Sequence, residues 1–477
     1  MDYEAVIGME VHAQLLTDTK IFCSCSTKFG SAPNTNVCPV CTGMPGSLPV
    51  LNKKVVDFAI KLGLAVKGRI NKRSIFARKN YFYPDLPKGY QISQLELPIV
   101  EDGVIEFYLG DEKKKVALTR IHMEEDAGKL IHGAGSNSHS YVDLNRAGVP
   151  LLEIVSEPEI YSPAEAAAYV KAIRSIVRYL GVSDGNMDEG SMRADANISI
   201  RPVGAKELGV KVEIKNMNSF KHIEKALDYE IERQTAVLES GGKIYQETRL
   251  WDTVVNKTFS MRSKEEANDY RYFPEPDLVF LDINDEWEEE IRVTVPELPL
   301  DKKERYESEF NLPSSDAEVL TGEKTIADFF EESVKLLNKP KIISNWIMSE
   351  LLRELNEEGI GIEKATVTPA LLVELVKLIE DGTISGKIGK TVFSEMYKTG
   401  KSPNDIVKEK GLIQITDEGE IEKIIDSIIE NSPNEVEKYR AGKKGLMGFF
   451  VGQVMKETRG KANPGIVNKI LVKKLEG

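Results

Sequence analysis

Residues 191–201 read SMRADANISIR, and polar and apolar side chains alternate through them without interruption. Side chains on a β-strand point to opposite faces with a period of two, so this pattern predicts a half-buried strand. Its polar face would present Arg193, Asp195 and Asn197 together with two hydroxyls and a second guanidinium group. A merely solvated strand is the alternative, but so ordered a set of polar groups favours a binding surface.

The same alternation recurs in other segments. Glu10 and His12 share one face of an opening strand, Lys215 lies on the polar side of another, and Glu153 lies on that of a third. We expect an antiparallel or mixed sheet with one face on a core and the other face polar and open. The predicted fold class is α+β, with helices flanking the sheet.

Helical periodicity appears between the strands in the first part of the chain and replaces the strand pattern in the later part. Helices are predicted at 163–180 and 222–238, the first with Ser162 as its N-cap. A proline-punctuated linker at 296–301 separates this part from an all-helical region, and a second break follows at 399–404. We therefore expect a catalytic cradle domain at 1–295, a helical linker domain at 296–400 and a helical tail domain at 401–477.

Charge is distributed unevenly along the chain. The 477 residues carry 63 Lys and Arg against 76 Asp and Glu, a net charge of −13 that argues against a general nucleic-acid coat. Residues 438–477, however, hold ten basic and two acidic side chains. Such a basic end suits a local RNA or phosphate contact, although solvated helix faces are the alternative. No apolar run suggests a membrane span and no signal segment opens the sequence, so we expect a cytoplasmic protein.

The cysteines form one compact group, C-x-C-x12-C-x2-C. Thiolates at this spacing suit a tetrahedral Zn²⁺, and four sulfur ligands leave no open position, so the metal would be structural. Disulfides or a redox pair are the alternatives. No cysteine remains for a nucleophile, so another polypeptide would have to release nitrogen from glutamine. The candidate zinc ligands are Cys23, Cys25, Cys38 and Cys41.

Hard-cation ligands gather on the polar strand faces. Glu10 and His12 lie two residues apart on one strand, which places their side chains ~6.7 Å apart. The acidic segment 122–126 and Glu153 offer further carboxylates. Several carboxylates with one imidazole fit Mg²⁺ bound to a nucleotide better than they fit zinc. Acids engaged in separate salt bridges are the alternative.

Residues 78–94, RKNYFYPDLPKGYQISQ, follow neither the strand period nor the helix period. They combine cations and aromatic rings with two prolines, which predicts a structured loop able to hold phosphate and a base or ribose. A surface loop pinned by its aromatic residues is the alternative.

Taken together, these segments resemble the B subunits of the bacterial aspartyl/glutamyl-tRNA amidotransferases over essentially the whole chain. The matching segments, in order, are VIGMEVHAQL, ARKNYFYPDLPKGYQISQ, TRIHMEEDAGK, VDLNRAGVPLLEIVSEP, EGSMRADANISIR, EIKNMNSF, DYRYFPEPDL and GFFVGQVMKETRGKANP.

The resemblance implies an activity and partners. An amidase (glutaminase) subunit would free ammonia from glutamine, and a small third subunit would join the other two. The present chain would bind mischarged Glu-tRNA(Gln) or Asp-tRNA(Asn), phosphorylate the side-chain carboxylate with ATP and let ammonia displace phosphate. The tail domain resembles a helical family also found as a free-standing protein and would bind the tRNA.

The resemblance also implies a set of site residues. The expected Mg²⁺ ligands are Glu10, His12, Glu125 and Glu153, with Glu125 chosen over Glu124. The expected nucleotide-binding residues are Lys79, Asn80, Tyr81 and Tyr83, of which Lys79 is also catalytic. The strand face itself, rather than the resemblance, places Arg193, Asp195, Asn197 and Lys215 around ATP and the substrate carboxylate.

Two other functions stay open. An ATP-dependent ligase acting on a free carboxylate would use the same sheet face and would turn over without tRNA. A non-catalytic tRNA-binding scaffold would consume no ATP.

Overall fold

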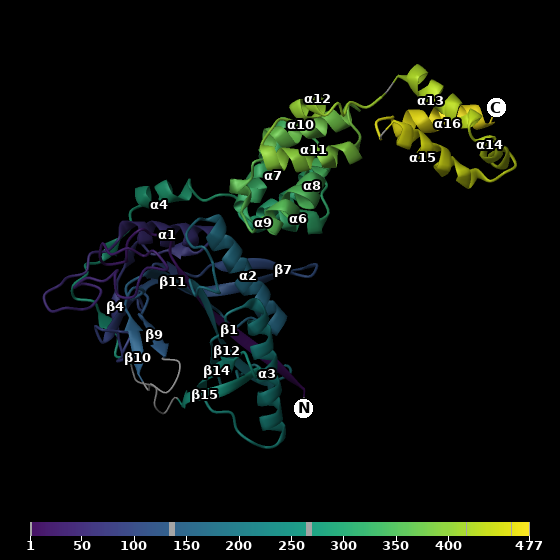
Figure 1. Ribbon diagram of the computed structural model, residues 1–477. Coiled ribbons are helices and arrows are strands. Elements are labelled where there is room, and N and C mark those ends of the chain that lie inside the picture. Colours follow the sequence, from purple (N-terminus) through teal and green to yellow (C-terminus); the bar gives the residue numbers. More distant parts are fainter. Residues whose placement is uncertain (1, 133–138, 264–269, 416, 459, 477) are drawn as a thin grey trace. The chain divides into compact units, whose positions relative to one another are not determined.

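The structure is a computed structural model that describes residues 2–132, 139–263, 270–415, 417–458 and 460–476. The chain divides into two compact units, Met1–Asp301 and Lys302–Gly477. Within the described residues, the first unit holds one large hydrophobic core and the second unit holds two smaller ones. Strands lie in the first unit, and the second is helical (Figure 1).

A mixed sheet dominates the first unit. Its order is β15-β14-β13-β12-β1-β11-β8-β6-β2, with β7 paired to β8. The pair β13–β14 is parallel and the other pairs are antiparallel, so the predicted mixed sheet is confirmed. The strands are β1 (Tyr3–Gln14), β2 (Arg69–Ile70), β6 (Val100–Glu101), β7 (Val104–Leu109), β8 (Glu112–Glu125), β11 (Pro150–Ser156), β12 (Met192–Pro202), β13 (Val212–Lys215), β14 (Glu247–Asp252) and β15 (Lys257–Ser263).

The register of β1 against β12 separates the two faces of the sheet. His12 lies opposite Arg193 and Glu10 lies opposite Asp195, all on one face. The alternate residues, from Met192 to Ile200, are buried on the other face. A slip of one residue would drive the charged side chains into the core, so the hydrophobic alternation fixes the register.

Three helices cover the apolar face: α1 (Lys53–Ala65), α2 (Pro163–Tyr179) and α3 (Phe220–Glu239). Ser162 caps α2 as predicted, because its hydroxyl accepts a hydrogen bond from the backbone N–H of Glu165 (3.2 Å). Figure 1 shows α2 and α3 along one side of the sheet and the strands β4, β9 and β10 on the other side.

Smaller sheets stand on the polar side. One has the order β16-β4-β5 and joins β4 (Ala77–Asn80) to both neighbours. The remaining strands are β5 (Tyr90–Ser93), β16 (Phe273–Pro274), the pair β9 (Lys129–His132) and β10 (Ser140–Asp143), and the pair β3 (Arg73–Ser74) and β17 (Leu281–Asp282). The predicted loop at 78–94 is therefore held at both ends by strands. The helix α4 (Asp285–Arg292) follows the last strand of the first unit.

The predicted linker at 296–301 is partly helical, because Pro299 opens α5 (Pro299–Phe310), where a proline fits the first turn. The first core of the second unit also includes Ile406 and Val407 of α12 (Pro403–Glu409). The predicted break at 399–404 therefore lies inside that core, and the last core begins at Ile421. No helix of the described residues has the length and hydropathy needed to cross a membrane.

The helices of the second unit follow in short succession. They are α5, α6 (Ser314–Thr321), α7 (Lys324–Leu336), α8 (Pro340–Trp346), the π-helical turn Ile347–Leu351, α9 (Leu352–Glu358), α10 (Pro369–Glu380), α11 (Gly386–Thr399), α12, α13 (Glu418–Glu430), α14 (Pro433–Arg440), α15 (Met447–Glu457) and α16 (Pro464–Glu476).

Candidate active site and metal centres

A row of polar side chains crosses four neighbouring strands of the open face. Arg193 on β12 lies opposite His12 on β1, which lies opposite Glu153 on β11, which lies opposite His122 on β8. Neighbouring strands are ~4.8 Å apart, so the row spans about 14 Å. The sequence assigned roles to three of its members, whereas His122 stood only within the acidic segment 122–126 and had no role of its own.

Two buried carboxylates and two imidazoles meet at one end of this row. The Nε2 atoms of His12 and His122 each lie 3.3 Å from Oε2 of Glu153 and 3.8 Å from a carboxylate oxygen of Glu124. His12, Glu124 and Glu153 can turn one ligand atom each toward a common point. We call these four residues the carboxylate–histidine cluster.

The structure replaces Glu125 by Glu124 in this cluster. Because side chains alternate along β8, Glu124 shares the face of His122 and Glu125 points to the other side of the strand. There Glu125 pairs with the ammonium group of Lys88 and accepts a hydrogen bond from the backbone N–H of Ile92 (2.8 Å). Glu10 also lies outside the cluster and accepts a hydrogen bond from Asn197 (2.7 Å).

The charges in the cluster are mutually stabilised. Burial raises the pKa of Glu153, but the two imidazoles outweigh burial and hold that pKa well below its usual range. Burial likewise opposes protonation of His122, yet Glu153 and Glu124 raise its pKa to about 9. The Nδ1 atom of His122 is buried without a hydrogen-bond partner among the described residues.

These residues fit a hard cation. Mg²⁺ uses one or two protein carboxylates together with waters and substrate phosphates, and Glu124 and Glu153 offer such oxygens at one point. An imidazole can add a nitrogen ligand in its neutral form only, so a bound cation would displace the proton from His12.

Lys79 of β4 extends toward the same carboxylates. Its Nζ atom lies 5.0 Å from the centre of the Tyr270 ring. Burial would lower the pKa of Lys79, but the fields of Glu124 and then of Tyr272 and Glu153 raise it above its ordinary value. The site therefore holds a half-buried ammonium group whose counter-charges are the carboxylates of the cluster.

Aromatic residues from a distant segment surround Lys79. The ring centre of Tyr270 lies 6.0 Å from that of Tyr81 and 6.2 Å from that of Tyr272, both edge to face. The sequence assigned no role to the segment DYRYFPEPDL beyond its match to the family. Its spacing offers no signal that it would fold back onto Lys79.

An ion pair fixes this segment beside β4. Arg78 donates to both oxygens of the fully buried Glu275 carboxylate (2.7 and 2.8 Å) and also contacts the more exposed Asp277 (3.1 Å). The guanidinium group of Arg78 stacks 4.2 Å from the centre of the Tyr90 ring on β5. Arg78 thus joins the three strands on which the surroundings of Lys79 depend.

The other predicted loop residues play unequal parts. Asn80 donates from its side-chain amide to the carbonyl of Arg271 (2.8 Å), so it ties two backbone segments together. Tyr81 lies against Tyr270, and burial raises the pKa of its hydroxyl. Tyr83 is exposed at 57% and lies outside these contacts.

Each of the predicted strand-face residues has a charged or polar partner. Lys215 donates to Asp195 (2.6 Å), and it also contacts Glu213 (2.9 Å). At the other end of the face, Arg193 contacts the buried carboxylate of Asp126 (3.1 Å). Burial raises the pKa of Asp126, but Arg193 and Arg146 outweigh it and hold that pKa low.

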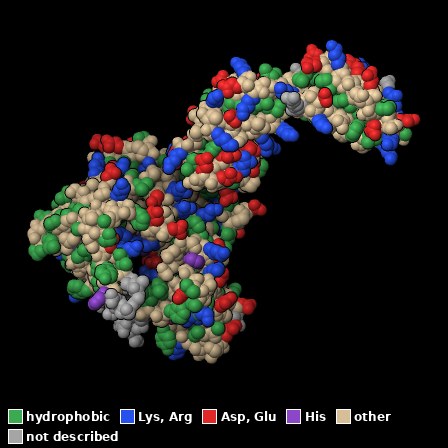
Figure 2. Space-filling model, viewed as in Figure 1, with side chains coloured by type: hydrophobic (Ala, Val, Ile, Leu, Met, Phe, Trp, Pro, Cys, Tyr) green, Lys and Arg blue, Asp and Glu red, His purple; other side chains and the backbone are tan. Residues whose placement is uncertain are grey.

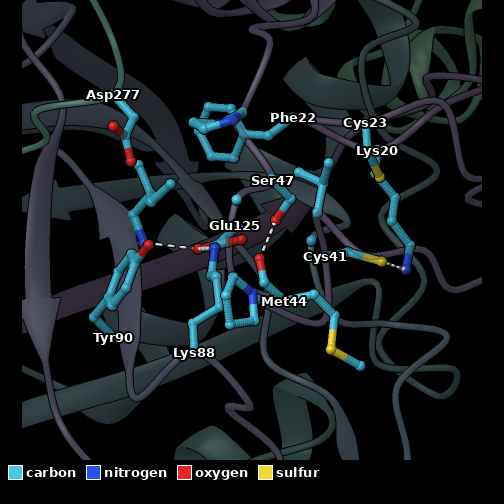
Figure 3. A pocket seen from close by; sticks show the side chains of 17 residues that line it. Lys20, Phe22, Cys23, Cys41, Met44, Ser47, Lys88, Tyr90, Glu125 and Asp277 are labelled. Atoms are coloured by element: carbon cyan, nitrogen blue, oxygen red, sulfur yellow. Dashed lines mark hydrogen bonds and ion pairs between the residues drawn. The ribbon is translucent and has the colours of Figure 1, made fainter.

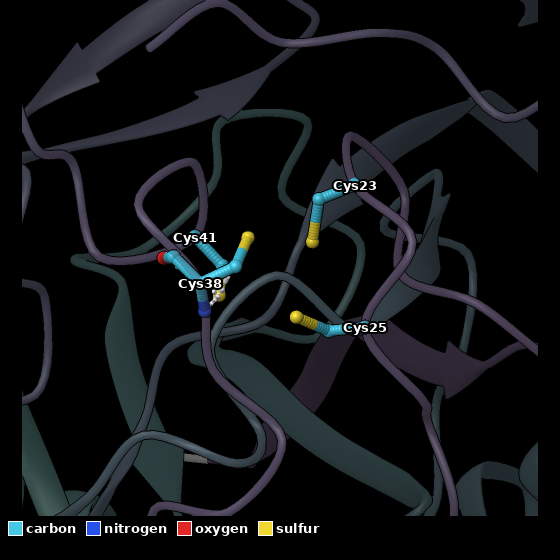
Figure 4. Close-up of side chains that lie close together, drawn as sticks. All are labelled: Cys23, Cys25, Cys38 and Cys41. Carbon is cyan, nitrogen blue, oxygen red and sulfur yellow. Dashed lines mark hydrogen bonds between the residues drawn. The ribbon is translucent and has the colours of Figure 1, made fainter.

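The four cysteines converge as predicted from their spacing. Their sulfur atoms lie within 4.8 Å of one another, and the pairs Cys23–Cys25 and Cys38–Cys41 approach from two turns of the loop (Figure 4). A hydrogen bond from Cys23 lowers the pKa of the Cys41 thiol, and the charge of Lys20 contributes. Four convergent sulfurs, one of them favoured as a thiolate, fit a tetrahedral zinc site.

A cavity of about 210 Å³ lies between the cysteine loop and β5 (Figure 3). The Lys88–Glu125 ion pair lies on one wall, and Cys41, Met44 and Ser47 line the other. Glu125 is thus a cavity residue on the side of β8 opposite to the carboxylate–histidine cluster.

Family comparisons agree with this architecture. The model of the GatB/GatE catalytic domain matches residues 5–289, which contain the mixed sheet, the carboxylate–histidine cluster and the cysteine loop. The model of the GatB domain matches residues 328–475 of the helical unit. Together they cover most of the chain, and the chain belongs to the GatB/GatE family.

Curated relatives match over the full length and are named as B subunits of aspartyl/glutamyl-tRNA(Asn/Gln) amidotransferase. The protein from Thermodesulfovibrio yellowstonii is 60% identical over 476 residues, covering 100% of both chains. Those from Geotalea daltonii and Persephonella marina are each 59% identical, covering 100% and 99% of both chains respectively. The chain is thus similar to amidotransferase B subunits along the whole length of each match.

Replacing Glu275 by Gln should loosen the segment around Tyr270, because it removes the buried carboxylate that is the main counter-charge of the half-buried Arg78 guanidinium group. Breaking a buried ion pair on one side costs about 3–5 kcal/mol. Urea unfolding followed by tryptophan fluorescence and hydrogen exchange of peptides from 270–277 would measure the loss. Asp277→Asn is the matched control, since this exposed partner should contribute less than about 1 kcal/mol. Equal effects of the two substitutions would contradict the assignment.

Proposed function

We propose that the chain activates the side-chain carboxylate of a mischarged tRNA, Glu-tRNA(Gln) or Asp-tRNA(Asn), by phosphorylation with ATP. Ammonia then displaces the phosphate to give the amide. The observation that carries this proposal is the row from Arg193 to His122 on an open sheet face, with the half-buried ammonium group of Lys79 beside it.

The chemistry explains the residue types. A carboxylate resists attack by ammonia because oxide is a poor leaving group, and transfer of a phosphoryl group to it corrects this. Phosphoryl transfer depends on positioning and on neutralising the phosphate charge rather than on a protein nucleophile. The site accordingly offers cations and hard ligands, and its described residues include no cysteine outside the zinc-type group.

Each side chain has a place in this scheme. Lys79 binds a phosphate oxygen, since its ammonium group is held between tyrosine rings and carboxylates. Arg193 binds the substrate carboxylate at the other end of the row, and Asp126 keeps its guanidinium group oriented. Asp195, Asn197 and Lys215 extend the polar face beside it.

Two metals complete the proposal. Glu124, Glu153 and His12 hold Mg²⁺, which when bound neutralises charge on the transferring phosphate. The four cysteines hold a structural Zn²⁺ that closes the loop 23–41. In this scheme Glu10 holds the side chain of Asn197 by accepting its hydrogen bond. It becomes a ligand of the cation only where the bound cation draws its carboxylate toward Glu153.

Partners follow from the same chemistry. The relatives are named as B subunits, and this chain's described cysteines are gathered in one group, so a separate amidase (glutaminase) subunit supplies ammonia. A small third subunit joins the complex, and the assembly works in the cytoplasm. A ligase acting on a free carboxylate would use the same face but would have no use for the basic segment 438–477.

We place the tRNA-binding tail domain after α12. Residues 413–477 carry eleven basic and ten acidic side chains, so the basic end is nearly balanced by acidic side chains, half of which lie on α13. Lys469 and Lys474 pair with acids of α13, and Lys444 pairs with Glu476. Figure 2 accordingly shows red and blue side chains interspersed over this part. Arg459 lies outside the described residues.

Within residues 438–477, the lysines without an ion pair among the described residues are the candidates for phosphate contact: Lys438, Lys443, Lys456, Lys461 and Lys473. Their charge acts within a Debye length of ~8 Å, so the net charge of −13 on the chain does not prevent a local contact.

Lys79→Ala should lower ATP-dependent amide formation by about 10²–10³-fold, because one preorganised charge at a developing phosphate is worth that much. The affinity for glutamyl-tRNA should stay unchanged. The measurement is amide formation from glutamyl-tRNA with ATP and ammonium, with the exposed Lys243→Ala as control. Normal turnover in both Lys79→Ala and Glu10→Ala would refute the site. Turnover with free glutamate in place of glutamyl-tRNA would favour the ligase instead.

Glu124→Gln should raise the Mg²⁺ concentration needed for half-maximal activity by at least about 10-fold, since even outer residues of metal sites cost 10–100-fold. Glu125→Gln is the isosteric control on the opposite side of β8 and should leave that concentration unchanged. If only Glu125→Gln raised the required Mg²⁺ concentration, Glu125 rather than Glu124 would be the Mg²⁺ ligand, as expected from the sequence.

Removing residues 416–477 should weaken tRNA binding and flatten its salt dependence, because fewer counterions are released from the phosphates. This truncation keeps α12 and hence the core around Ile406. Filter binding at several salt concentrations would test it, with circular dichroism as the check on the remaining helices. An unchanged affinity and slope would contradict a tRNA-binding tail.

A further inference from the structure

Lys20 is a lysine with no exposed surface, although it lies only three residues from Cys23 in the loop. Its Nζ atom contacts three acceptors: the carbonyl of Asn36 (2.7 Å), the carbonyl of Leu144 (3.3 Å) and the sulfur of Cys41 (3.6 Å). The ammonium group therefore has as many acceptors as it has protons to donate.

Burial of an ammonium group is costly unless an opposite charge lies beside it. No carboxylate of the described residues forms an ion pair with Lys20, and two of its three acceptors are neutral carbonyls. The remaining acceptor, Cys41, supplies negative charge only as a thiolate. Four thiolates around one divalent cation carry a net charge of −2, so a positive neighbour stabilises such a centre.

We propose that Lys20 is a positioning residue of the cysteine site, whose ammonium group compensates the charge of the metal–thiolate centre and holds Cys41 in place. The proposal rests on the zinc site proposed above. It accounts for a charged side chain in a position that would otherwise favour a hydrophobic residue.

The same ammonium group joins the cysteine loop to the turn before β11. Its bond to Leu144 is one of several across this boundary, because Asn36 donates its backbone N–H to the side chain of Asn145 (2.8 Å). The stem of Lys20 and the Cβ atom of Cys41 also lie close to Gly148, whose φ of +84° disfavours any other residue there. The cysteine site and the turn at 144–148 thus form one unit around Lys20.

Lys20→Met removes the charge while keeping the length of the side chain, and it is tested in the full chain. Zinc content after dialysis and competition with a chromogenic chelator give the zinc affinity, and Co²⁺ substitution reports the thiolate charge-transfer band. We expect zinc affinity to fall by about 10–100-fold and the cobalt band to shift. Lys20→Arg should recover part of the affinity, and the exposed Lys28→Met of the same loop should match the wild type.

Wild-type zinc affinity in Lys20→Met would overturn the proposal while leaving the zinc site intact. A wild-type chain without zinc would instead refute the zinc site. If Lys20→Met fails to fold, hydrogen exchange of the wild type decides the question. Chelation of zinc should then release protection at 142–148 together with 36–41, and protection retained at 142–148 would refute the joint unit.

Discussion

The pairing of β1 with β12 sets the register of the central sheet, and the polar site is built on that register. Eleven consecutive residue pairs hold the two strands, and their inward side chains are almost entirely buried. Each fully buried aliphatic side chain contributes about 1.5–3 kcal/mol, so the register is fixed by the core rather than by the charges. The charged face can therefore carry Arg193 and His12 side by side without determining the fold itself.

Concentrated negative charge is the second constraint. Glu124 and Glu153 are buried on adjacent strands, and carboxylates brought together in this way are stable only beside positive charge. Two imidazoles and Lys79 supply it in the free protein. A cation and the phosphates of a nucleotide could replace part of this network, because the binding groups are already desolvated and held by strands.

Alternation along single strands and the convergence of the four cysteines could be predicted from the sequence, because both depend on short-range spacing. The choice between Glu124 and Glu125 could not, since it depends on which residue of β8 shares the face of His12. Tyr270 and Tyr272 reach Lys79 through the pairing of β16 with β4, two strands far apart in the sequence, which no local pattern encodes. The core that includes Ile406 likewise extends past the glycine and proline break at 399–404, because contacts between residues far apart in the sequence build it.

Near the C-terminus, a count of charged residues along the sequence gives the wrong impression of the local electrostatic field. The basic end faces the acidic helix α13, so pairs such as Lys474 with Glu422 cancel part of its field. Electrostatic attraction to RNA then depends on the few lysines whose ammonium groups are not paired with α13. If this domain binds tRNA as proposed, a phosphate contact made by so few charges would be weak, and its salt dependence would be correspondingly shallow.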